Sequence, residues 1–194
     1  MDPIRKFSLW FAAAIKERPG DWYDPTAMTL ATSTTDGQVS ARMVLLKSFG
    51  PDGFTFFTNY KSKKGLQLLE NPRAALVFYW PYLMRQIRIE GRIERVTYDE
   101  SERYFHSRPR LSQIAAAVSK QSEVIPSRHK LISDFTALRK KLNKQAVELP
   151  PHWGGYRLIP DMLEFWRNRR NRLHERERYR KKRDGRWVME YLAP

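Results

Sequence analysis

The chain has 194 residues, a length that suits one domain with a real core or at most two small domains. It contains no cysteine, which excludes disulfides, thiolate metal sites and cysteine nucleophiles, and no apolar run approaches the roughly 18–20 residues that span a bilayer. The formal net charge of +15 leaves two classes of partner open, nucleic acids and small dianionic ligands, because Lys and Arg bind phosphates in both.

The first segment is predicted to be an amphipathic helix. Asp2 can cap it, Pro3 suits the first helical position, and apolar residues from Ile4 to Ile15 recur at helical spacing. Arg18-Pro19-Gly20 should end the helix. Charged residues on both sides of the apolar stretch argue against a secretory signal, so we expect a cytoplasmic protein, which the lack of cysteine also fits.

The rest of the chain alternates between strand-like and helix-like patterns. Strands are predicted at 28–33, 39–47, 54–58, 74–80 and 86–96, with turns at 36–37 and 50–53 and a short helix at 62–69. Helices are predicted from Thr97, which opens a capping box, to Phe105, and at 111–119 and 129–142. Strands return at 153–158, 162–166, 172–180 and 187–192. Residues 1–194 are therefore predicted to form one α+β domain, a mainly antiparallel β-barrel with helices packed outside.

Three side chains near the end of the chain suggest a ligand-binding row. In a strand, Arg172, His174 and Arg176 would project on one face, about 6.5–7 Å apart, whereas in a helix they would diverge. The alternative is a solvated basic surface, because residues 167–186 hold eleven Lys or Arg residues against three acids. The four histidines of the chain lie far apart without HxH or HExxH spacing, so no metal site is expected.

Arg42 and Lys47 are candidate anion-binding residues in a predicted strand. They lie an odd number of residues apart, so an ideal strand would place them on opposite faces. They would then contact different ligands, or different parts of one site, unless a bulge intervenes. The alternative is a half-buried strand whose end charges reach solvent.

A possible phosphate cradle precedes the short helix at 62–69. Thr58, Ser62, Lys63 and Lys64 surround the start of this helix, where hydroxyl, ammonium and backbone N–H groups would suit a phosphate. On its own this pattern is also common on protein surfaces.

A second phosphate site is suggested by Tyr104, Arg108 and Ser112, which recur every four residues. Pro109 should break the helix between them, so the three side chains would line a corner between two helices. An ordinary helix corner is the alternative.

Together these segments resemble the pyridoxamine phosphate oxidase (pyridoxine 5′-phosphate oxidase) family, from about Asp2 to Pro194. The matching motifs, in chain order, are Asp24-Pro25-Thr26-Ala27-Met28, RMVLLK, FFTNYKSKKG, RQIRIEG, YFHSRPRLSQIAAAVSKQS, HWGGYRL, EFW, RLHER and the final LAP. Each motif alone is weak, but their number and order make the match strong. The resemblance implies an FMN-binding split β-barrel with peripheral helices, in which 1–20 is the N-terminal helix and 150–194 holds the C-terminal strands with the RLHER motif.

The resemblance also implies an activity and a set of site residues. The expected enzyme oxidises pyridoxamine or pyridoxine 5′-phosphate to pyridoxal 5′-phosphate with FMN and O₂, releases H₂O₂ (and ammonia from the amine), and works as a homodimer with FMN between the subunits. The implied FMN contacts are Arg42, Met43, Val44, Leu45, Phe57, Thr58, Lys63, Lys64, Gln86, Gln121, Ser122, Trp166 and Arg176. The implied substrate contacts are Lys47, Tyr104, Arg108, Ser112, Arg172 and His174, of which Arg172 and His174 are the catalytic candidates.

The chain departs from the family pattern in three places. The first helix begins almost at residue 1, so an arm that folds over the substrate in some relatives is expected to be missing. Residues 167–171 (RNRRN) replace a glycine-containing turn of some relatives. Phe57 and Lys63 stand where Tyr and Arg also occur, which removes a hydroxyl donor and a bidentate fork and should tune FMN affinity.

Three other functions remain open at this point. A related flavin oxidase would act on another aromatic substrate, such as a phenazine precursor, although Tyr104, Arg108 and Ser112 favour a phosphorylated substrate. A basic nucleic-acid-binding module would use residues 167–186 and show steep salt dependence. A flavin-binding protein without turnover is the third. We expect neither a membrane nor a nucleic acid to be the main partner.

Overall fold

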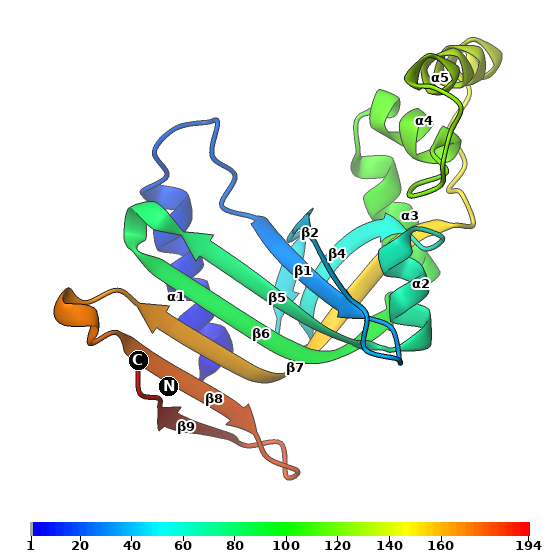
Figure 1. Ribbon diagram of the computed structural model, residues 1–194. Helices are drawn as coiled ribbons and strands as arrows, with labels where there is room; N and C mark the ends of the chain where they lie inside the picture. Colours follow the sequence, from blue (N-terminus) through cyan, green and yellow to red (C-terminus); the bar gives the residue numbers. More distant parts are fainter. Residues whose placement is uncertain (1) are drawn as a thin grey trace.

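A nine-stranded antiparallel sheet organises residues 2–194, the part of the chain that this computed structural model describes (Figure 1). The strands are β1 Ala27–Ser33, β2 Val39–Leu45, β3 Ser48–Gly50, β4 Gly53–Asn59, β5 Arg73–Trp80, β6 Arg85–Arg95, β7 Trp153–Arg167, β8 Glu175–Lys181 and β9 Trp187–Tyr191. The helices are α1 Pro3–Lys16, α2 Lys63–Glu70, α3 Tyr98–Ser107, α4 Arg110–Val118 and α5 Arg128–Leu142, with short 3₁₀ turns η1 Pro81–Leu83 and η2 Arg170–Arg172.

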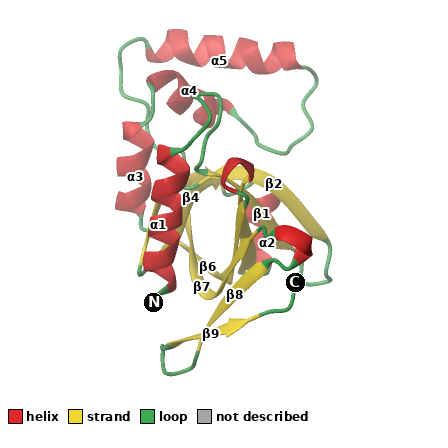
Figure 2. Cartoon of the chain, turned by 90° about the vertical axis from the view of Figure 1, so that its left-hand side faces the viewer, coloured by secondary structure: helices red, strands yellow, loops and turns green. Residues whose placement is uncertain are grey.

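The sheet curls into an open barrel with the strand order β2-β1-β5-β6-β7-β4-β3 (Figure 2). The long strand β7 pairs with β6 along its length, with β4 through its first half and with β8 through its second half. The sheet thus branches at β7, where β4 and β8 pair with different halves of the strand, and the β8–β9 hairpin extends away from the barrel. The predicted α+β class with an antiparallel barrel is confirmed.

Helix ends follow the sequence signals. Asp2 caps α1 by accepting from the backbone N–H of Arg5, and Thr97 forms the predicted capping box with Glu100 at α3. Pro109 separates α3 from α4, as predicted. None of the helices in residues 2–194 combines the length and the apolarity that a membrane crossing needs.

The main core fills the inside of the curled sheet. Phe7 of α1 is fully buried there, with ring centroids 4.8–5.2 Å from Phe49, Phe54 and Phe78. These edge-to-face contacts fix α1 across the barrel. A second, smaller cluster of Phe105, Ile114, Val147 and Trp153 attaches α3 and α4 to the start of β7.

The opposite side of the sheet, which we call the outer face, carries the residues that alternate with the core. Cross-strand pairs place Gln86 beside Trp166, Arg88 beside Glu164, and Trp166 beside Arg176. The same face continues over β5, β1 and β2 with small or apolar residues, namely Ala75, Val77, Tyr79, Thr29, Ala31, Ala41 and Met43.

Three strand predictions need correction. Residues 153–158 and 162–166 are one strand, because a bulge at Asp161 opposite Glu90 and Gly91 absorbs the irregularity that Pro160 introduces. The strand predicted to run to Lys47 ends at Leu45, and the short β3 follows.

The strand predicted at 172–180 begins only at Glu175. Asn171 and Arg172 adopt left-handed conformations, with φ of 57° and 59°, and Arg172 belongs to the turn η2. The prediction that Arg172, His174 and Arg176 share one strand face is therefore wrong, because Arg172 lies in a left-handed turn, where the alternation of strand side chains does not apply.

Candidate functional site

A cavity of about 1110 Å³ opens between β2, β4, the start of α2 and the corner of α3 and α4. The predicted cofactor residues among its lining are Arg42, Met43, Val44, Leu45, Phe57, Thr58, Lys63, Lys64, Gln121 and Ser122. The predicted substrate residues among it are Lys47, Tyr104, Arg108 and Ser112. The remaining lining residues are Ser40, Ala41, Asn59, Ala115, Ala116, Ser119 and Trp153.

The cavity is strongly cationic and its cations lack carboxylate partners. In the described part of the chain, five Lys or Arg residues line it and no Asp or Glu does. Within residues 2–194, none of these five cations forms an ion pair, whereas Arg157, Arg176 and Arg178 outside the cavity each contact a glutamate. The cavity therefore offers uncompensated positive charge, which favours an anion with several negative charges.

Of these five cations, Lys64 has the pKa that departs most from its ordinary value. Ser62 caps α2, and the Lys64 Nζ donates to Gln121 Oε1 (2.9 Å), Thr58 Oγ1 (3.2 Å) and Ser62 Oγ (3.2 Å). Burial, followed by repulsion from Arg42, lowers the pKa of Lys64 from 10.5 to about 8. A buried ammonium that has only neutral acceptors around it is stabilised when an anionic ligand binds beside it.

Arg42 is held by the neighbouring strand. Its Nη1 donates to Leu30 O (3.0 Å) and Thr32 Oγ1 (2.7 Å), and burial lowers its pKa. Because β2 ends at Leu45, the alternation rule does not extend to Lys47, whose backbone N–H donates to Thr55 O (2.8 Å). Arg42 and Lys47 both line the same cavity.

The corner between α3 and α4 brings together Tyr104, Arg108 and Ser112, as predicted from Pro109. The Arg108 guanidinium lies 4.7 Å from the centroid of the Trp153 ring, and its buried Nη1 has no hydrogen-bond partner in residues 2–194. Burial lowers the pKa of Arg108. A buried guanidinium N–H without a partner needs an acceptor from a ligand or from water.

Aromatic rings form one wall of the cavity. Phe57 stacks on Tyr104 with centroids 3.9 Å apart and on Trp153 with centroids 5.6 Å apart. Phe57, which lacks the hydroxyl of a tyrosine, thus contributes a flat apolar surface that positions the Tyr104 ring.

The other predicted site residues lie outside this cavity. Gln86, Trp166 and Arg176 lie together on the outer face, and the His174 ring lies 4.8 Å from the Trp166 ring. His174 Nδ1 accepts from the backbone N–H of Arg169 (3.2 Å), which places the proton of the neutral ring on Nε2. Arg172 is exposed in the turn η2, which precedes β8. The predicted site residues of one chain therefore fall into two groups, those that line the cavity and those outside it, namely Gln86, Trp166, Arg172, His174 and Arg176.

Asn59 and Trp153 also line the cavity, although no sequence pattern indicated them as site residues. Asn59 Nδ2 donates to Ser119 O (3.1 Å) and so fixes the segment that carries Gln121 and Ser122. Trp153 supports Arg108 and Phe57. Both lie in or beside quoted motifs, but their contacts join segments far apart in the sequence.

Comparisons with known proteins agree with this arrangement. The family model for "Pyridoxamine 5′-phosphate oxidase" matches residues 14–141, and the model for "Pyridoxine 5′-phosphate oxidase C-terminal dimerisation region" matches residues 153–194. The chain is 50% identical to the pyridoxine/pyridoxamine 5′-phosphate oxidase of Trichormus variabilis over 193 residues, covering 100% of this chain and 89% of the relative. It is 46% identical to the pyridoxine-5′-phosphate oxidase of Bos taurus over 208 residues, covering 100% and 79%.

Solved structures support the same fold. PhzG from Burkholderia lata, solved in complex with tetrahydrophenazine-1-carboxylic acid, superposes with a TM-score of 0.92 at 31% identity and covers 100% of this chain and 93% of that chain. A pyridoxamine 5′-phosphate oxidase-related, FMN-binding protein from Nostoc punctiforme gives a TM-score of 0.78 at 16% identity, covering 100% and 98%. The second likeness concerns the fold alone.

Proposed function

Because the chain belongs to the pyridoxamine 5′-phosphate oxidase family, we propose that it oxidises pyridoxamine and pyridoxine 5′-phosphate to pyridoxal 5′-phosphate with FMN as its cofactor. O₂ is the final acceptor, H₂O₂ is released, and the amine substrate also yields ammonia. The observation that carries this proposal is the cavity, which among residues 2–194 has five cations without ion-pair partners and no carboxylate, and so suits two phosphorylated ligands.

The cofactor half of the cavity fits FMN. Lys64, with Ser62 and Thr58 around it, offers a phosphate the hydrogen bonds and the charge that the fold leaves uncompensated. Eight further residues complete the proposed FMN contacts on this side. They are Arg42, Phe57, Lys63, Gln121 and Ser122, with the backbone of Met43, Val44 and Leu45. Bound FMN would supply the electron acceptor, which the protein's own side chains cannot.

The substrate phosphate is assigned to the other end of the cavity, where Lys47, Tyr104, Arg108 and Ser112 meet. The partnerless Nη1 of Arg108 supports this assignment, because a phosphate oxygen would satisfy it. Tyr104 is held against Phe57, so its hydroxyl is oriented before the substrate arrives.

A partner subunit would complete the site. Gln86, Trp166 and Arg176 lie outside the cavity of their own chain, so FMN held by both groups of residues requires a second copy. The exposed apolar side chains of Met43, Leu45 and Tyr79 support pairing through the outer face, and the family model that matches 153–194 is that of a dimerisation region. Light scattering on the yellow protein tests this, and a flavin-loaded monomer would refute it.

Arg172 and His174 are the proposed catalytic residues, brought over the substrate ring from the partner subunit. His174 Nε2 and the Arg172 guanidinium would orient the substrate and assist proton removal. We expect Arg172→Ala and His174→Ala each to slow flavin reduction at saturating pyridoxamine 5′-phosphate by about 10²-fold or more, the usual contribution of a positioned acid or base. Stopped-flow absorbance measures this rate, and unchanged rates in both variants would remove the two residues from catalysis.

The proposed function itself is tested by spectroscopy. The purified protein should be yellow with oxidised-flavin bands, and pyridoxamine 5′-phosphate added without oxygen should bleach them. A protein that neither carries nor binds FMN would refute the proposal.

Two alternatives give different results in the same experiment. The likeness to PhzG favours an oxidase of another aromatic substrate, and such an enzyme would not discriminate between pyridoxamine 5′-phosphate and pyridoxamine. A nucleic-acid-binding protein would be colourless. It is disfavoured because four of the eleven Lys or Arg residues in 167–186, namely Arg169, Arg176, Arg178 and Arg186, already contact carboxylates.

A further inference from the structure

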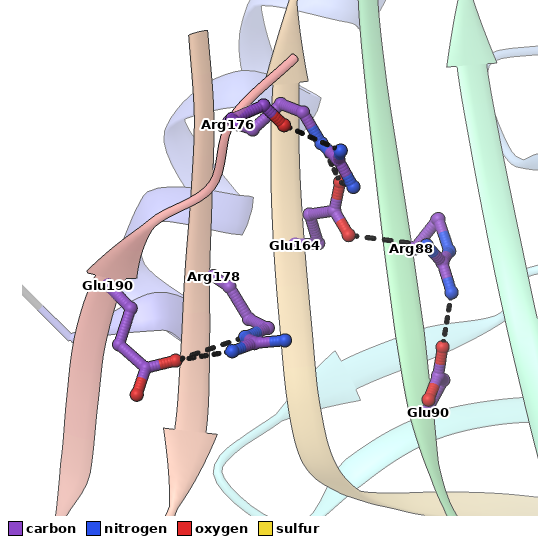
Figure 3. Close-up of polar contacts among 7 residues, drawn as sticks. Arg88, Glu90, Glu164, Arg176, Arg178 and Glu190 are labelled. Carbon is purple, nitrogen blue, oxygen red and sulfur yellow. Dashed lines mark hydrogen bonds and ion pairs between the residues drawn. The ribbon is translucent and has the colours of Figure 1, made fainter.

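A buried carboxylate lies at the centre of the outer face. Glu164 of β7 is only 4% exposed, although it belongs to a face that is otherwise accessible. Figure 3 shows it between Arg176 of β8 and Arg88 of β6. A carboxylate is almost never buried to this degree unless it is paired, and here both of its oxygens are committed to arginines.

The contacts of Glu164 immobilise the Arg176 guanidinium. Arg176 Nε donates to Glu164 Oε1 (2.8 Å), and Nη2 lies 2.8 Å from the same oxygen. On the other edge, Arg176 Nη1 donates to Ala193 O (2.9 Å). A guanidinium that is held on two edges cannot rotate, and its remaining N–H groups point in fixed directions.

The second oxygen of Glu164 binds Arg88, whose Nη1 lies 3.2 Å from Oε2, and Arg88 Nη2 contacts Glu90 Oε1 (2.5 Å). The Glu164 carboxylate is thus anchored from the β6 side while it holds Arg176 from the β8 side (Figure 3). Because both of its oxygens bind arginines and its side chain is only 4% exposed, Glu164 would act on the site through these arginines.

We propose that Glu164 is a positioning residue, which holds the Arg176 guanidinium in the orientation that binds FMN across the subunit interface. This inference rests on the proposed function, because Arg176 is there assigned to the cofactor. Stability alone gives little reason for such a cluster, since apolar residues of similar volume often replace buried ion pairs without loss. Orientation of a guanidinium, in contrast, requires a fixed carboxylate.

The outer face also supplies a matched control. Glu190 of β9 binds Arg178 through Nε (3.1 Å) and Nη2 (2.7 Å), on the same face and one strand farther out. Glu190 is 42% exposed and forms no hydrogen bond or ion pair with Arg176 or Arg88 in the described chain. Glu190→Gln therefore removes a similar ion pair, and it removes none of the bonds that Arg176 forms with Glu164 and Ala193.

The test measures FMN dissociation from the holoenzyme, as the rise of flavin fluorescence on dilution. Glu164→Gln should raise the Kd about tenfold, a size typical of residues that share a hydrogen-bonded network, whereas Glu190→Gln should stay within about twofold of wild type. In an Arg176→Ala background, which itself weakens FMN binding, Glu164→Gln should have no further effect. If Glu164→Gln yields no folded protein, Glu164→Asp, which draws the carboxylate back by one methylene, should show the same loss.

Each outcome decides the matter. Equal Kd values for wild type and the Glu164 variant, or an undiminished effect of Glu164→Gln in the Arg176→Ala background, would overturn the positioning role. A wild-type protein that does not bind FMN would instead refute the proposed function. A drop in melting temperature with unchanged Kd would show that Glu164 serves only folding.

Discussion

Cofactor affinity is predicted to fall as the pH rises above 8, because of Lys64. Its ammonium is buried against Thr58, Ser62 and Gln121, and its pKa in the free protein is about 8. A phosphate beside it would favour the charged form and return the pKa toward the ordinary 10.5. Binding above pH 8 therefore takes up a proton, so affinity decreases as the pH increases.

The two pKa values set the size of the effect. Below pH 7 nearly all of the free protein already carries a charged Lys64, so Lys64 adds no further pH dependence to the Kd for FMN there. With a pKa of about 8 in the free protein, and a phosphate that keeps Lys64 charged through pH 9 in the complex, proton linkage raises the Kd about tenfold between pH 7 and pH 9. The FMN phosphate loses its second proton near pH 6, so it adds little above pH 7.

Fluorescence titrations of the protein with FMN at pH 7, 8 and 9 measure this slope. Lys64→Arg should flatten it, because a guanidinium stays protonated through this range. Lys63→Gln is the control, since Lys63 is exposed at the same cavity and its loss should weaken binding without changing the slope. A pH-independent wild type, or a slope that survives in Lys64→Arg, would refute this account of Lys64.

Two further changes test the cavity and its framework. Arg108→Met should raise the KM for pyridoxamine 5′-phosphate about 100-fold or more with little change in kcat, because it removes a charged phosphate contact; steady-state kinetics check this, and an equal loss with unphosphorylated pyridoxamine would contradict it. Gly65→Ala would place a Cβ 2.1 Å from Tyr60 O, so it should lower the unfolding free energy by about 1–3 kcal/mol. Thermal melts check this against Gly50→Ala, which meets nothing within 4 Å, and equal melting temperatures would contradict it.

Local chemistry explains what the sequence predicted well. Caps at Asp2 and Thr97 and the break at Pro109 depend on neighbouring residues, and the structure has all three. The two sets of side chains predicted to bind phosphate, around Lys64 and around Arg108, line one cavity. Each set was recognisable because it lies where one element ends and the next begins.

The rest depends on features that the pattern does not contain. Arg172, His174 and Arg176 were predicted to share one strand face, but β8 begins only at Glu175. Asn171 and Arg172 form a left-handed turn before it, and no glycine or proline in the sequence marks this turn. The neighbourhood of Gln86 and Trp166 needs the register between β6 and β7, which only the folded sheet provides. The role proposed for Glu164 could not be predicted from the sequence, because it depends on the register of β6, β7 and β8 and on the burial of the carboxylate.

Strand β7 has a consequence for how the molecule tolerates changes in chain length. Trp153 at its start borders the cavity and Trp166 near its end lies on the outer face, about 40 Å apart along an extended strand. A one-residue insertion between them would turn every later side chain to the other surface and detach Trp166 from the ligand it is expected to share with the neighbouring subunit. Length variation should therefore be accepted in the exposed connections at 123–127 and 143–146, which lie outside the sheet and beyond the cavity lining, while the spacing between the two tryptophans stays constant.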